Sequence, residues 1–412
     1  MAAEPARSET AGRAAAEAAA RNAYGKLLAS LVRRTRDLAA AEDALADAFA
    51  AALERWPEDG PPDRPEAWLL TTARRKLIDR SRRDAVRREA EPQLALLTDG
   101  LAEAAEAGAL PDHRLGLMLA CADPAIDPGL RTPLMLQVVL GLDAARIGSA
   151  FLVSPAAMGQ RLSRGKAAIK QAGLVFDPPG ADALPARLAP VLDAVYAAYG
   201  AGWEAPAGEG KVRDLTEEAR FLARLITELS PGAAEAWALF ALIEYCEARA
   251  PARRDGEGRF VPLSDQDPAL WDGAAIARAE TALKHALGLA PPGRYALEAA
   301  IQSVHAERRL TGRTNWPAAA SLYDALHQSG EAGLGAQIAR ACAHGEAFGA
   351  DAALGLLEGL HAADHQPLEA ARAHWLAAAG RLEDARAAYD RAAALSADPA
   401  VREFLSRRRA QL

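Results

Sequence analysis

The chain has 412 residues and a net charge of −7, and 50% of its residues are hydrophobic but only 5% are aromatic. This length suffices for two or three domains with substantial cores. The acidic total excludes a surface that is basic throughout, so any nucleic-acid contact must be local. Alanine, leucine, arginine and glutamate abound while runs of valine, isoleucine and threonine are few, and this composition predicts an all-α fold.

Cys121, Cys246 and Cys342 are isolated along the chain and form no C-x-x-C pair. An odd number of separated cysteines predicts neither a disulfide framework nor a structural zinc site. Residues 1–22 lack the apolar core of a signal peptide, and no stretch reaches about eighteen consecutive apolar residues. We therefore expect a cytoplasmic protein with no membrane partner.

Two helices are expected over residues 14–36 and 38–56, where apolar side chains recur at helical spacing. Asp37 can cap the second helix, and Pro57 predicts its end at the preceding residue, because proline disfavours helical geometry there. Pro65 suits the first turn of a third helix. The pattern predicts three neighbouring helices with a shared core.

The helix that begins at Pro65 is strongly basic. From Arg64 to Arg88 the sequence has nine basic and three acidic residues, in a chain whose total charge is −7. Because its apolar side chains pack inward, a set of basic side chains is left for phosphate or base contacts. That set is Arg74, Arg75, Lys76, Arg80, Arg82 and Arg83.

Asp43 and Asp47 lie one helical turn apart on the preceding helix, where a basic partner would be favoured and a solvated face is the alternative. The run AEDALADAF, followed by AWLLTTARRKLIDRSRR, resembles region 2 of the extracytoplasmic-function (group 4) sigma-70 factors. In that family the first helix docks on the clamp helices of core RNA polymerase, which implies Asp43, Asp47 and Phe49 as polymerase contacts. The next loop and basic helix open and read the promoter −10 element, although Arg75 stands where relatives often carry Asn. The resemblance therefore implies a region 2-like domain over residues 1–88.

Residues 89–110 are a linker rich in Glu and Ala, and a second helical module is expected over residues 111–178. Asp143 can cap a short helix, and Ser154 followed by Pro155 supplies the cap and first residue of the next. This is a helix-turn-helix pattern. Its second helix carries four positive charges and no acidic residue, as a recognition helix would.

Side chains near the start of a recognition helix enter the major groove of DNA, and other basic ones meet phosphates. The order of the two modules resembles regions 2 and 4 of a sigma factor that lacks region 3. The resemblance implies −35 recognition by the second module, with promoter DNA and core RNA polymerase, through its clamp helices and flap, as partners. The expected −35 contacts are Ala156, Ala157, Gln160, Arg161 and Arg164 near bases, and Lys166 and Lys170 at phosphates.

The segment LACADPAI departs from the CCHPAL-like sequence common in close relatives. Cys121 is kept, but Ala122 and Asp123 replace the other cysteine and the histidine. A metal site needs several such ligands together. We therefore expect no metal or redox role at this segment.

Two further groups were candidates for a metal site. Asp265, Asp267 and Asp272 are spaced too widely for a calcium loop, and loop capping explains them as well. His361 and His365 have no third ligand. Since no phosphate loop, catalytic serine motif or cysteine partner is present either, the sequence predicts no cofactor and no enzymatic activity.

Residues 179–412 form degenerate repeats of the tetratricopeptide (TPR) type, with small residues where paired helices cross and proline after the second helix. A turn-rich insertion with one short hairpin interrupts them at residues 251–274. The runs DGEGRF, DQDPALWD, GRYALEAAIQSVHAE and TNWPAAASLYDAL resemble the long extension of one subgroup of extracytoplasmic-function sigma factors. A TPR-like solenoid can bind a protein or peptide in its concave face.

The leading hypothesis is a sigma factor that directs promoter-specific transcription initiation and is regulated in cis by its extension. The alternative is a helix-turn-helix DNA-binding regulator with a TPR sensor domain, which leaves Asp43, Asp47 and the basic helix unexplained. A third hypothesis is an interaction scaffold whose basic helices bind acidic proteins. Promoter-dependent transcription separates the first from the other two.

Overall fold

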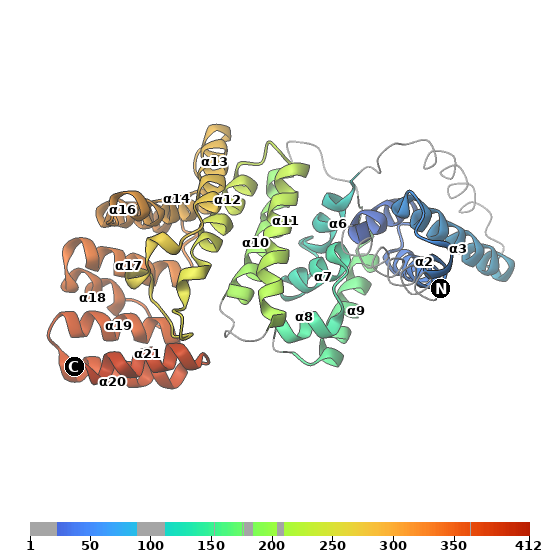
Figure 1. Ribbon diagram of the computed structural model, residues 1–412. Helices are drawn as coiled ribbons and strands as arrows, with labels where there is room; N and C mark the ends of the chain where they lie inside the picture. Colours follow the sequence, from blue (N-terminus) through green and yellow to red (C-terminus); the bar gives the residue numbers. More distant parts are fainter. Residues whose placement is uncertain are drawn as a thin grey trace, which may run out of the picture. The chain divides into compact units, whose positions relative to one another are not determined.

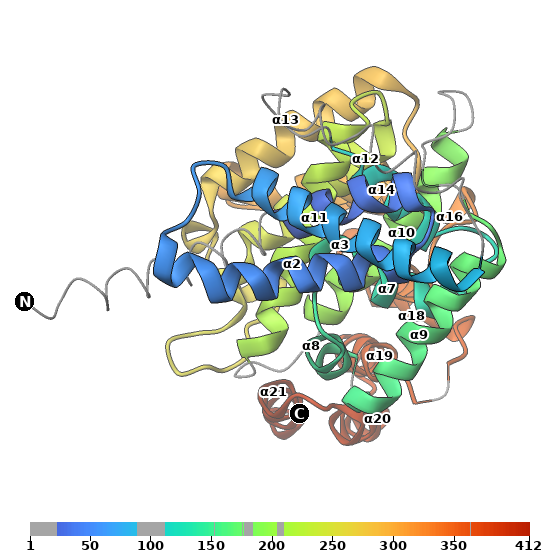
Figure 2. The ribbon, with the colours of Figure 1, turned by 90° about the vertical axis from the view of Figure 1, so that its right-hand side faces the viewer.

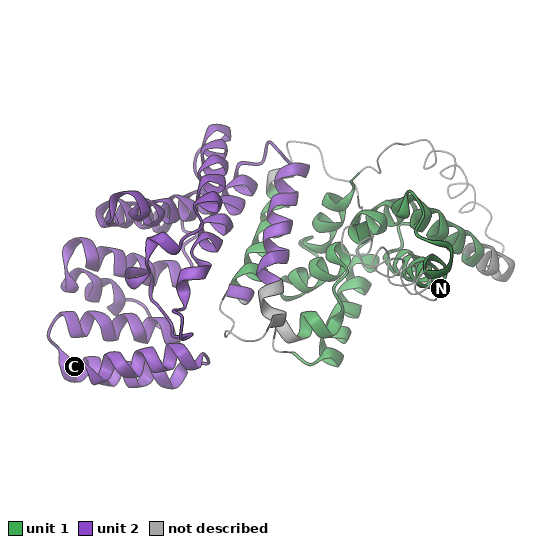
Figure 3. Ribbon diagram, in the orientation of Figure 1, with its two compact units in different colours: residues 1–201 green, residues 202–412 purple. Residues whose placement is uncertain are grey.

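The computed structural model describes residues 23–88, 112–151, 153–174, 176, 184–203, 210–362 and 364–412. Within these ranges the chain is all-α and contains no strand, which confirms the predicted fold class. The chain divides into two compact units, residues 1–201 and 202–412 (Figure 3). The first unit holds both basic helices that the sequence analysis singled out.

A helix over residues 23–35 is followed in the first unit by α2 (Leu38–Asp59) and α3 (Pro65–Arg88), which lie side by side (Figures 1 and 2). Asp37 caps α2 as predicted, because its side chain accepts a hydrogen bond from the Ala40 N–H at 3.1 Å. Pro65 is the first residue of α3. The buried apolar side chains of these helices include Leu27, Leu31, Leu45, Trp56, Leu69 and Ala73.

The end of α2 differs from the prediction. The helix continues to Asp59 with Pro57 inside it, so the expected end at Trp56 is wrong. A proline lacks an N–H, so the helix loses only the hydrogen bond that residue 57 would donate. Helical hydrogen bonding continues beyond it, since the Gly60 N–H donates to Trp56 O at 3.0 Å. Gly60 has a φ of +80°, which glycine adopts readily, and it ends the helix.

Among the described residues in the remainder of the first unit, four helices pack around α7. Thr132 Oγ1 on α7 donates to the Ala194 carbonyl at 3.1 Å, and Arg187 pairs with Asp123 at 2.8 Å. Residues 184–201, which the sequence analysis assigned to the extension, therefore belong to the first compact unit. The helices are α6 (Arg114–Cys121), α7 (Pro128–Leu140), α8 (Ala144–Ala150), α9 (Pro155–Gln171) and α10 (Leu184–Trp203).

The second unit consists of helices that pack mainly against their neighbours in sequence (Figure 1). Several small residues of these helices, such as Ala279, Ala319 and Ala385, are fully buried. The α-helices are α11 (Gly210–Leu229), α12 (Ala234–Ala248), α13 (Gly273–Leu289), α14 (Arg294–Ala306), α15 (Arg308–Thr311), α16 (Trp316–Gln328), α17 (Leu334–Phe348), α18 (Ala350–Glu358), α19 (Gln366–Ala378), α20 (Leu382–Leu395) and α21 (Pro399–Ala410).

The insertion between α12 and α13 reaches the far end of the second unit. An isolated antiparallel bridge joins Arg254 to Phe260, at the expected hairpin. Arg254 forms an ion pair with Asp398, which caps α21, and Phe260 packs edge-on against Phe404 with ring centroids 5.5 Å apart. The insertion therefore ties the first repeats to the last helix. Its three short 3-10 turns are η1 (Ala250–Arg253), η2 (Leu263–Asp265) and η3 (Pro268–Leu270).

Candidate nucleic-acid and polymerase interface

The acidic residues of α2 project from its exposed face. Asp43 and Asp47 are both exposed, while the α2 positions that face the core are apolar. The Arg80 guanidinium of α3 donates to Asp43 Oδ2 at 2.7 Å. Phe49 is half-buried and stacks on Tyr24, with ring centroids 6.4 Å apart. The Asp43 and Asp47 face of α2 thus carries negative charge, while Phe49 lies on another side of the helix, against Tyr24.

The basic residues of α3 divide into exposed and buried positions. Arg75, Lys76 and Arg80 are exposed. Arg74 differs from the expectation, because its side chain is only 5% exposed and occupies the buried face of the helix. The side chains of Arg82 and Arg83 lie outside the described part of the chain.

The start of α9 is fixed by the predicted caps. Asp143 Oδ1 accepts a hydrogen bond from the Arg146 N–H at 2.7 Å at the start of α8, and Ser154 Oγ accepts one from the Ala157 N–H at 3.3 Å. Pro155 is the first residue of α9. The predicted turn residue Leu152 lies outside the described residues. Two short-range hydrogen bonds therefore set where each helix of this hairpin begins.

The two faces of α9 have opposite character. Met158, Leu162 and Ile169 are buried, as their spacing predicts. On the other side, the first half of the helix leaves cationic and small side chains accessible, which suits contact with a DNA groove. The exposed positions there are Ala156, Gln160, Arg161 and Arg164, with Ala157 half-buried.

The second half of α9 docks on α2. Lys166 Nζ donates to Glu42 Oε2 at 2.7 Å, and Lys170 Nζ donates to Asp37 Oδ2 at 3.2 Å. Burial tends to raise the pKa of the Glu42 carboxyl and outweighs the opposing effect of the Lys166 ammonium. Two lysines expected at phosphates are thus held by carboxylates of the same chain.

Comparison with known proteins bears on both units. Residues 21–87 match the family model of sigma-70 region 2. The chain therefore contains a sigma-70 region 2 domain. Residues 187–287 match a family of unknown function (DUF6596), which begins within α10 and ends within α13. The matched region 2 contains α2 and nearly all of α3, the helices that carry the acidic and basic faces.

A relative is similar to this chain over nearly its full length. It is an uncharacterized protein of Rhizobium meliloti (strain 1021), 35% identical over 393 residues, which cover 93% of this chain and 92% of that protein. The two proteins are members of one family over both units. No solved structure matches the chain.

Three of the side chains considered as metal ligands cap helices. Asp267 and Asp272 cap η3 and α13, and His365 caps α19. Within the described ranges, no group of three or more His, Cys, Asp or Glu side chains is arranged to hold a metal ion. No described helix is long and apolar enough to cross a bilayer.

Sequence reasoning missed Glu42 and Asp37 as partners of α9. No local signal identified these pairs, because their members lie 124 and 133 residues apart in the chain. Arg74, in contrast, had a local signal. It lies four residues after Leu70 and four before Ile78, both of which are buried, so it shares their face of α3.

Proposed function

We propose that this protein is an extracytoplasmic-function (group 4) sigma-70 family RNA polymerase sigma factor that directs promoter-specific transcription initiation. The observation that carries the proposal is the pairing of an exposed acidic face on α2 with an exposed basic face on α3 within a region 2 domain. An acidic helix face favours a basic protein partner, and a basic helix favours nucleic acid. Polymerase and promoter DNA are the partners that region 2 implies.

In this proposal α2 docks on the clamp helices of core polymerase through Asp43, Asp47 and Phe49. Residues 57–88, which include the loop after α2 and helix α3, melt and read the −10 element. The contributing side chains are Arg75, Lys76, Arg80, Arg82 and Arg83, which can offset the cost of unstacking DNA by phosphate contacts. Arg74 is left out of this set because its side chain is buried.

The α8–α9 hairpin is proposed to act as region 4, with the flap as its polymerase contact. Its exposed first half would place Ala156, Ala157, Gln160, Arg161 and Arg164 along the major groove of the −35 element. Lys166 and Lys170 would meet phosphates. Arginine in that position can bind guanine by two hydrogen bonds, which is the contact that gives sequence preference.

The second unit is proposed to be a TPR-like extension that regulates the sigma module in cis and binds a protein or peptide. The burial of several small residues of its helices supports this assignment. A truncated protein that tests regulation should end after α10 and not at residue 178, because α10 packs on α7 within the first unit. Unchanged transcription and unchanged polymerase affinity after this deletion would remove the regulatory role.

The test of the sigma assignment is transcription by core polymerase reconstituted with this protein on its own upstream DNA. Asp43→Arg/Asp47→Arg should abolish specific transcripts, because it reverses the charge offered to the clamp. The matched control is Glu54→Arg/Glu58→Arg, which makes the same change of charge at exposed residues of the same helix. If the wild-type protein supports no initiation but binds duplex DNA alone, the helix-turn-helix regulator is the correct reading.

A further inference from the structure

The contact between α2 and α9 is specific in charge and geometry. Both lysines of the second half of α9 reach a carboxylate of α2, with donor–acceptor distances of 2.7 Å and 3.2 Å. The Lys166–Glu42 pair is mostly shielded, since its two side chains are 23% and 15% exposed. A shielded pair is screened less by salt than an exposed one. The contact is therefore less sensitive to salt than an ordinary surface ion pair.

Close backbone packing supports the same arrangement. A Cβ atom added at Gly25, in the helix before α2, would lie 1.9 Å from the Val139 carbonyl oxygen at the end of α7. The aromatic ring of Tyr24 covers Gly141, the C-cap of α7. Only glycine allows two backbones to approach this closely. The region 2 helices and the α6–α9 helices thus form one packed body within the first unit.

This packed body is incompatible with simultaneous contact to two separated promoter elements. The −10 and −35 elements lie about 25 base pairs apart, which is about 85 Å along B-DNA at 3.4 Å per base pair. In the structure, however, α9 touches α2, which is itself paired with α3 through Asp43 and Arg80. Lys166 is only 23% exposed in its pair and must leave Glu42 to bind a phosphate, whereas Lys170 is 72% exposed and its pairing with Asp37 competes with a phosphate.

We propose that the α2–α9 contact is a closed state in which Glu42 and Asp37 mimic DNA phosphates and withhold Lys166 and Lys170, so that duplex DNA must displace α2 from α9. The role of this state in transcription rests on the proposed sigma function. The α2–α9 contact and its competition with DNA are independent of that proposed function. The acidic residues that hold α9 are distinct from Asp43 and Asp47, which point away from it and stay exposed.

The closed state is tested first by zero-length crosslinking of the full-length protein with a carbodiimide. This reagent joins a carboxylate and an amine that are in contact, with loss of water, and mass spectrometry identifies the joined peptides. We expect Asp37 or Glu42 joined to Lys170 or Lys166 in the free chain, and at least a fivefold lower yield with saturating duplex DNA. Absence of these links in the free chain, or an unchanged yield with DNA, overturns the proposal.

The second measurement is the affinity of the full-length protein for duplex DNA that carries its own upstream sequence. Asp37→Asn/Glu42→Gln removes both carboxylates, while asparagine retains the oxygen that caps α2. We expect affinity about threefold to tenfold higher than that of Glu54→Gln/Glu58→Gln, which removes the same charge from exposed positions that do not contact α9. Equal affinities of the two variants overturn the proposal.

A cooperative thermal unfolding transition in both variants would show that each is folded. The crosslinking experiment needs no variant, because it uses the unaltered chain. The outcomes also distinguish the proposed sigma function from the proposed closed state. Crosslinks and an affinity gain without any promoter-dependent transcription would reject the sigma assignment and support the closed state. Transcription without crosslinks would do the reverse.

Discussion

The Arg80 guanidinium lies 2.7 Å from the Asp43 carboxylate, and this ion pair links the acidic face of α2 to the basic face of α3. Both side chains are more than half exposed, at 52% and 62%. The two residues are proposed to face different partners, polymerase and DNA. Binding of either partner would therefore change the charge that the other partner meets.

Arg80→Ala should reduce promoter binding with little loss of stability. An exposed pair contributes about 0.2–1 kcal/mol, so the free energy of unfolding should fall by no more than this. Loss of a phosphate contact should lower the slope of log affinity against log salt by about 1. Arg55→Ala, at an exposed position of α2, is the control and should leave the slope unchanged. An unaltered slope in Arg80→Ala would exclude this phosphate contact.

Glu244→Gln should destabilise the second unit. The Glu244 carboxylate is 1% exposed and accepts hydrogen bonds from Arg220 and from Arg278, the latter at 2.8 Å. Replacing a buried charged acceptor by an amide should lower the free energy of unfolding by about 1–3 kcal/mol. Urea unfolding measures it. Glu228→Gln, which breaks an exposed pair with Arg224, should change it by less than about 0.5 kcal/mol.

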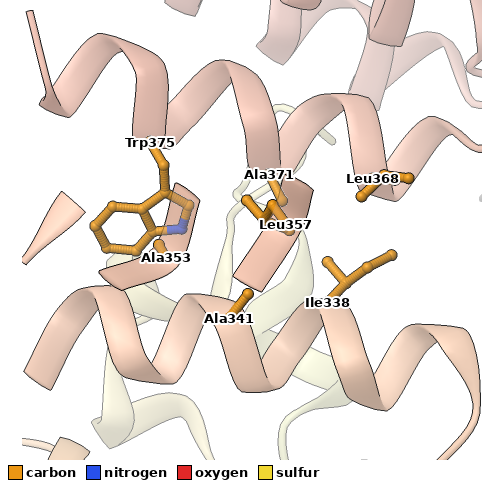
Figure 4. Close-up of a cluster of buried hydrophobic side chains, with 7 residues drawn as sticks. All are labelled: Ile338, Ala341, Ala353, Leu357, Leu368, Ala371 and Trp375. Atoms are coloured by element: carbon orange, nitrogen blue, oxygen red, sulfur yellow. The ribbon is translucent and has the colours of Figure 1, made fainter. Parts of the chain in front are cut away.

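Gly345→Ala should also destabilise the second unit, by overpacking. The added Cβ would lie 2.4 Å from Cζ2 of the Trp375 ring, which is fixed in a buried apolar cluster (Figure 4). We expect a loss of about 1–3 kcal/mol in the free energy of unfolding. Gly355→Ala in α18 meets no atom within 4 Å and should be neutral or stabilise by up to about 1 kcal/mol. A melting temperature raised by both substitutions would contradict this packing.

The second unit should lose stability on mild acidification. Burial, with Arg249 and Arg308 nearby, lowers the pKa of His305 from 6.5 to about 3. The unfolded chain binds this proton near pH 6.5 and the folded chain does not, so stability is complete above pH 6.5 and falls as the pH decreases. At pH 5 the loss is about 2 kcal/mol.

Calorimetry at pH 7 and pH 5 measures this loss. His305→Gln should reduce the difference between the two unfolding free energies, because it removes the buried titrating group. His327→Gln, at an exposed position, should leave the difference as it is in the unaltered chain. If both variants lost the same unfolding free energy between pH 7 and pH 5, the lowered pKa of His305 would not be the cause of the loss.

Local features were predictable from the sequence. The caps Asp37 and Ser154 and the buried positions of α9 were all correct, because capping and helical periodicity depend on residues within one or two turns. The end of α2 was not. Pro57 and Gly60, three residues apart, could each end the helix. The hydrogen bond from the Gly60 N–H to Trp56 O shows that the helix ends at Gly60.

By itself, the sequence determined the all-α class, the helix starts and the charge of each helix face, since these follow from composition and short-range contacts. Tertiary structure alone decided which charged side chains remain available to bind another molecule. Lys166 and Glu42 are 124 residues apart in the chain and 2.7 Å apart in space. No local rule specifies such a pair, because it depends on the tertiary packing that also places Gly25 against Val139.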